Sequence, residues 1–105
     1  MVQLHTMYVY KGFYVISFSK EKNEILKSQR GIGFEDIILA IDDGKILDVY
    51  DHPDQISYPQ QKIYVIEALG YVYLVPFVKD ENGIFLKTII PSRKAKKIYK
   101  GENDA

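Results

Sequence analysis

The sequence contains no cysteine and no tryptophan, and it has only two histidines, His5 and His52. Without cysteine the chain cannot form disulfides, thiolate metal sites, iron–sulfur clusters or a cysteine nucleophile. Neither histidine has a second histidine three or four residues away, so neither begins a recognisable metal site. The sequence therefore predicts a protein that works without a metal ion or other cofactor.

Long apolar runs are also missing. No stretch approaches the roughly 20 residues that a membrane span requires, and residues 1–11 lack the basic and then apolar pattern of a secretory signal. The 105 residues, 47% of them apolar and 27% charged, are typical of one folded domain. We expect a single domain over residues 1–105, in the cytoplasm and without membrane contact.

The formal net charge of zero hides a separation of charge along the chain. Residues 84–100 carry a net charge of +6, which suits a local phosphate contact or simply a solvated basic helix. Residues 35–54 carry −6, and their aspartates lack the spacing of a calcium loop. We interpret these aspartates as a patch for a basic partner, with solvated helix ends and loops as the alternative: Asp42, Asp43, Asp48, Asp51 and Asp54.

Hydrophobic periodicity predicts an α+β domain in which two N-terminal helices pack on one face of an antiparallel meander and a short helix ends the chain. Ser19 and Ser92 are predicted helix N-caps, and Gly31 a helix stop. Residues 1–12 are an edge strand over 7–10 or are disordered, and Pro76 predicts a bulge or a free edge. The predicted strands cover residues 14–18, 46–50, 62–69, 71–78 and 84–90, and the predicted helices 20–30, 34–43 and 93–100.

The chain contains nine tyrosines, and five of them lie in its second half. If Leu69-Gly70 and Asn82-Gly83 are two-residue turns, one sheet face carries several aromatic and basic residues. Such a face can stack bases and hold phosphates; the alternative is a half-buried face with hydroxyls at its rim. The residues concerned are Lys62, Tyr64, Tyr71, Tyr73 and Thr88, with Arg93 following.

Two motifs carry a resemblance to a known family. One runs from Phe18 through the Lys-Asn pair at 22–23 to Gly31-Ile-Gly-Phe34-Glu35, and the other is Ile89-Ile-Pro-Ser-Arg-Lys-Ala95. Together they resemble the BrnT family of toxins, which have a small RelE-like fold. The resemblance extends from Phe18 to Tyr99.

The resemblance implies a toxin of a type II toxin–antitoxin pair that cleaves RNA, with or without the ribosome, and is neutralised by a DNA-binding, BrnA-like antitoxin. RelE-like enzymes use no metal, since they orient the ribose 2′-hydroxyl for attack on its own phosphate. The predicted catalytic residues are Arg93 as phosphate cation, Lys62 as second cation or base, Tyr64 for stacking or proton transfer, and His52 as an outside candidate. The predicted RNA-binding residues are Tyr73, Lys87, Lys94, Lys97 and Tyr99, of which Tyr99 is also a proton-transfer candidate.

Some family positions differ in this chain. Phe18-Ser19 stands where the family has Trp-Asp, and the family's arginine in the last strand falls on Thr88, with Lys87 one place away. His52 precedes a proline in a loop, where histidine is more often structural than catalytic. The alternative reading is therefore a non-catalytic BrnT-like module that pairs with a small antitoxin-like protein, and a third is a stand-alone regulatory domain.

Overall fold

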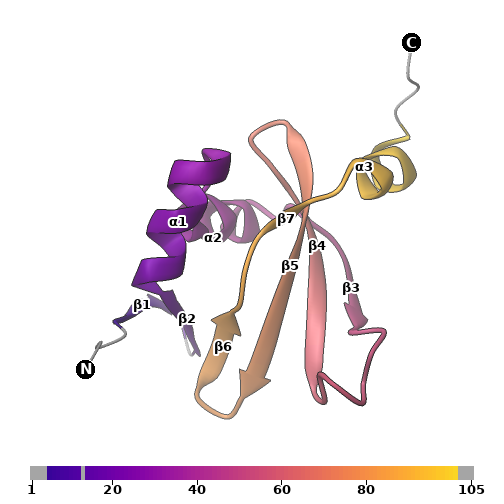
Figure 1. Ribbon diagram of the computed structural model, residues 1–105. Helices are drawn as coiled ribbons and strands as arrows, with labels where there is room; N and C mark the ends of the chain where they lie inside the picture. The colour runs from indigo at the N-terminus through magenta and orange to yellow at the C-terminus, as the bar shows by residue number, and fades with distance from the viewer. Residues whose placement is uncertain (1–4, 13, 102–105) are drawn as a thin grey trace.

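The computed structural model describes residues 5–12 and 14–101, which form an α+β domain with three helices around one sheet (Figure 1). Six of the seven described strands run in the order β1-β2-β6-β5-β4-β3. The seventh, β7, pairs with a different part of β5 from the part that pairs with β6. All neighbouring strands are antiparallel except β2 and β6, which are parallel. The strands are β1 (Thr6–Lys11), β2 (Tyr14–Ser19), β3 (Ile46–Asp51), β4 (Gln61–Ala68), β5 (Tyr71–Asp80), β6 (Gly83–Leu86) and β7 (Ile90–Pro91).

Helix α1 (Lys20–Arg30) begins and ends where the sequence predicts. The Ser19 hydroxyl accepts a hydrogen bond from the Lys22 N–H at 3.1 Å, which satisfies one of the free donors of the first turn. Gly31 takes a left-handed conformation with φ of 69° and donates its N–H to the Lys27 carbonyl. The predicted edge strand at 7–10 is also present as β1, while residues 1–4 lie outside the described residues.

Helix α2 (Phe34–Asp42) is tied to α1 by a buried asparagine. The Asn23 side chain accepts the Phe34 N–H at 2.7 Å and donates to both carboxylate oxygens of Glu35. Asn23 thus uses both its donor and its acceptor, which offsets the cost of burying an amide. Partial burial raises the pKa of Glu35, but hydrogen bonds from the Asn23 side chain, from its own backbone and from Lys27 together outweigh burial, so the pKa is lowered.

The two faces of the sheet have different covers. On one face, which we call the helix face, α1 and α2 enclose apolar side chains that include Ile16, Ile66 and Phe77. On the other, the open face, helix α3 (Arg93–Lys100) covers one end only, where Ala95 packs on Val65 and Val72. Figure 1 shows α1 and α2 together on one side and α3 apart from them. None of the described helices is long and apolar enough to cross a bilayer.

The predicted Leu69-Gly70 turn and its register are confirmed. Ala68 pairs with Tyr71 across the turn, and Ile66 with Tyr73, so the tyrosines predicted to share a face do share it. The next turn lies one residue earlier than predicted, because Asp80 pairs with Gly83. This shift leaves Leu86 on the predicted face, since the pairing sum changes by two residues.

The predicted strand over 84–90 is interrupted, and this is a correction. Strand β6 ends at Leu86 and β7 begins at Ile90. Between them Ile89 turns into the core, where Arg30 of α1 donates a hydrogen bond to its carbonyl. Pro76 of β5 faces this break: its carbonyl accepts the Lys87 N–H at 2.8 Å, so its own nitrogen, which has no hydrogen to donate, points to the same edge.

Candidate nucleic-acid interface

The tyrosine face predicted from the sequence is the helix face. The Tyr64 ring stacks on Phe77 with centroids 3.9 Å apart, and both Tyr64 and Tyr73 pack against the core beneath α1 and α2. Burial raises the pKa of both hydroxyls. The expectation of an uncovered platform here is therefore wrong, and the half-buried alternative holds. The physical reason is that the same face carries Ile66 and Phe77, whose large apolar side chains are more stable when helices pack over them and exclude water.

Lys62 and His52 lie together at one end of the sheet, near the loop over residues 51–60. Lys62 donates a hydrogen bond to Asp51 at 2.6 Å. His52 accepts the Asp54 N–H on Nδ1 at 3.0 Å, and its ring lies 4.4 Å from that of Tyr58. These contacts give His52 a structural role in the shape of the loop.

Arg93 lies towards the opposite end of the sheet from Lys62. Ile66 pairs with Tyr73, and Tyr73 pairs with Pro91, two residues before Arg93. Lys62 is four residues from Ile66 along β4, a span of about 13 Å. The structure therefore does not bring Arg93 together with Lys62 and Tyr64. In the described part of the chain, no three His, Asp or Glu side chains meet in a metal-binding arrangement.

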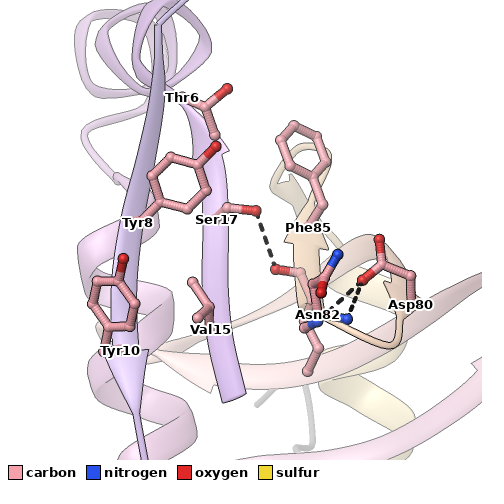
Figure 2. Close-up of a pocket in the computed structure, with 10 residues that line it drawn as sticks. Thr6, Tyr8, Tyr10, Val15, Ser17, Asp80, Asn82 and Phe85 are labelled. Carbon is pink, nitrogen blue, oxygen red and sulfur yellow. Dashed lines mark hydrogen bonds between the residues drawn. The ribbon is translucent and has the colours of Figure 1, made fainter.

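The open face contains a hollow of about 530 Å³ between β1 and the β5–β6 hairpin (Figure 2). Tyr8 and Tyr10 of β1 stand on one side of it, 59% and 77% exposed, and Phe85 of β6 stands on the other. Asp80 forms the far rim, where its Oδ1 accepts the N–H groups of Asn82 and Gly83. Exposed aromatic rings on an uncovered sheet are surfaces on which nucleic-acid bases can stack.

A cation lies beside one of these rings. The ammonium of Lys87 is 5.7 Å from the centroid of the Phe85 ring. Lys87 lies opposite Pro76 of β5, and Pro91 lies opposite Tyr73, three residues away on the same strand. The segment from Lys87 to Pro91 therefore runs beside β5 for about 10 Å towards α3. At that end α3 presents exposed basic side chains, among them Lys94 and Lys97, which were predicted to bind RNA, and Arg93, which was predicted to be the catalytic phosphate cation.

Polar contacts help to hold α3 to the sheet. The Tyr99 hydroxyl donates to Asp48 Oδ2 at 2.6 Å, and Lys100 pairs with Glu67 at 3.0 Å. The hydrogen bond lowers the pKa of Asp48 and raises that of Tyr99. Tyr99, predicted to stack on RNA or transfer a proton, is thus also a docking residue for α3.

The predicted acidic patch is dispersed over the molecule. Asp48 lies on the open face with Tyr99, and Asp51 points to the helix face, where Lys62 binds it. Asp54 caps its own loop by accepting the Ser57 N–H at 3.0 Å. Asp42 and Asp43 end α2. Successive side chains of a strand point to opposite faces, so closeness in sequence did not give a common surface.

Sequence reasoning missed Tyr8, Tyr10 and Phe85. The available signal was the alternation of Thr6, Tyr8 and Tyr10, which puts three side chains on one face of a strand. Comparison with family models, with curated proteins and with solved structures finds no match for this chain. The resemblance to BrnT toxins therefore rests on the two short motifs alone.

Proposed function

We propose that this protein binds single-stranded RNA across its open face and cleaves it, as the toxin of a type II toxin–antitoxin pair. The observation that carries the proposal is the hollow lined by Tyr8, Tyr10 and Phe85 on a sheet face that the helices leave uncovered, with Lys87 beside Phe85. The motif resemblance supports the reaction class.

In the proposed complex the aromatic rings contact the bases and the cations contact the phosphates. Bases stack on the exposed tyrosines and on Phe85, which tolerates any sequence because every base has a π-face. Phosphates follow the line from Lys87 to Arg93 and Lys94 at the start of α3. Neutral overall charge limits bulk electrostatic attraction, so the interaction depends on this local row of cations.

The proposed cleavage needs no metal. The ribose 2′-oxygen forms a bond to the adjacent phosphorus, the bond from phosphorus to the 5′-oxygen breaks, and the products are a 2′,3′-cyclic phosphate and a 5′-hydroxyl. Lys87 stabilises the extra negative charge on the phosphorane, and Arg93, at the start of α3, holds another phosphate further along the RNA strand. Asp80 accepts the proton of the 2′-hydroxyl, and a tyrosine hydroxyl of the hollow protonates the leaving oxygen.

The experiment uses the purified chain and a fluorescent 20-nucleotide RNA in EDTA, with binding and cleavage read separately. We expect cleavage with cyclic-phosphate ends, and Lys87→Ala and Arg93→Ala to slow it at least tenfold. Lys20→Ala removes an exposed cation at the start of α1 and is the matched control. Absence of RNA binding would overturn the proposal.

The second candidate is a non-catalytic module that pairs with an antitoxin-like protein. It is favoured by the separation of Arg93 from Lys62 and Tyr64, and by the structural contacts of His52. RNA binding without cleavage, together with a stable complex with the product of a neighbouring gene, would select this candidate.

A further inference from the structure

A second hollow, of about 340 Å³, lies where the end of α2 meets the β4–β5 turn. Leu39 of α2 and Leu69 of the turn line it, and they are 62% and 64% exposed. We call it the Leu39/Leu69 groove. Its lining includes Asp36, Asp43 and Lys45, whose charges sum to −1; Glu67 also lines it, but the Glu67 side chain shares the open face with Val72 and pairs with Lys100.

Leu69 is unfavourable in its own turn. It has φ of 51° and Gly70 has φ of 74°, the pattern of a type I′ turn, whose first central position favours asparagine or aspartate. A bulky side chain in the left-handed region is strained. Exposure at 64% means that packing inside this chain does not compensate. The residue is therefore costly to the fold at a place where asparagine would serve better.

Asp43 is also unfavourably placed. It is the C-cap of α2, where the partial negative charge of the helix end disfavours an acid, and the last turn of α2 contains no basic residue. Two side chains that the local structure disfavours thus line the same groove. Such conflicts between local preference and observed residue are expected at functional surfaces.

We propose that the Leu39/Leu69 groove is a docking site for a basic segment of a partner protein, which places one large apolar side chain against Leu39 and Leu69. The negative lining complements a basic segment and repels phosphates, so the groove does not extend the RNA surface. Asp36 also accepts the Gly33 N–H at 2.9 Å, and Glu67 pairs with Lys100. This inference stands independently of the proposed function.

The test uses a phage library of random twelve-residue peptides, selected on the purified wild-type chain. We expect the selected peptides to carry basic residues around one large apolar residue. Synthetic copies should bind Leu69→Asn and Asp43→Lys at least tenfold more weakly than the wild type. Ile56→Asn, which removes an equally large side chain that is 95% exposed in another loop, should bind them normally.

Thermal unfolding separates a lost contact from a damaged fold. Leu69→Asn should melt about 4–8 °C higher than the wild type, because asparagine relieves the turn. Equal peptide binding by Leu69→Asn, selection of acidic peptides or of none, or a lower melting temperature would overturn the proposal. So would wild-type self-association that Leu69→Asn abolishes, since the occupant would then be a second copy.

Discussion

The helix face and the open face are made of the same strands, yet one forms the core of the domain and the other carries an uncovered hollow. On the helix face Ile66, Val75 and Phe77 lie beneath α1 and α2 and form the main core. On the open face Tyr8, Tyr10 and Phe85 line a hollow that no described helix covers. Tyrosines occur on both faces, so the residue type alone does not distinguish a platform from a core. The cover decides.

The substitution with the largest expected effect on stability is at Gly83 of β6, which pairs with β2 and so links β1 and β2 to the rest of the sheet. Its φ is 152°, and a Cβ there would overlap the backbone carbonyl of Val15 in the parallel neighbour β2. Gly83→Ala should therefore cost about 4 kcal/mol or more in the free energy of unfolding, measured in urea. Gly44→Ala has open space around its Cβ and should cost only about 1–2 kcal/mol for its positive φ. Equal losses would contradict this account of the β2–β6 contact.

A matched pair of truncations sharpens the comparison. Ile66→Ala removes a fully buried side chain from the helix face and should lower stability by about 3 kcal/mol with little change in RNA affinity per folded molecule. Phe85→Ala removes a half-buried ring from the open face and should lower stability by about half as much, while RNA affinity falls by about 1–3 kcal/mol. Urea unfolding and fluorescence anisotropy give the two quantities. A loss of RNA affinity in Ile66→Ala and none in Phe85→Ala would contradict the roles assigned to the two faces.

The smallest expected effect concerns the attachment of α3 to the open face. The pKa of Asp48 is lowered from 3.8 in the fold, so its contribution is present above that value and is lost as the pH falls through the folded pKa. The pKa of Tyr99 is raised from 10.0, so its contribution is present below that value and is lost as the pH rises through the folded pKa.

Between these limits the Ala95 methyl resonance should keep its position against Val65 and Val72, and it should shift outside them. The Ile16 methyl of the helix face is the internal reference. In Tyr99→Phe, which lacks the hydroxyl but keeps the Lys100–Glu67 pair, the alkaline shift of Ala95 should become smaller. An unchanged alkaline shift in that variant would show that the Tyr99–Asp48 contact does not hold the helix.

Local signals in the sequence predicted local structure well. Ser19 and Gly31 bound α1 because capping requires few residues and no distant partner. The Leu69-Gly70 turn fixed the β4–β5 register for the same reason. The choice of covered face could not be predicted, since Val65 and Val72 alternate with Ile66 and Val75 and both sets are apolar. That choice depends on the parallel β2–β6 contact and on Arg30 reaching Ile89, which are contacts between distant parts of the chain.

The most direct test of the open face is ultraviolet crosslinking of a uridine-rich single-stranded RNA to the wild-type chain, with the modified residues located by mass spectrometry. This account predicts crosslinks at Tyr8, Tyr10 or Phe85 and none at Tyr64 or Tyr73. Crosslinks confined to Tyr64 and Tyr73 would contradict it.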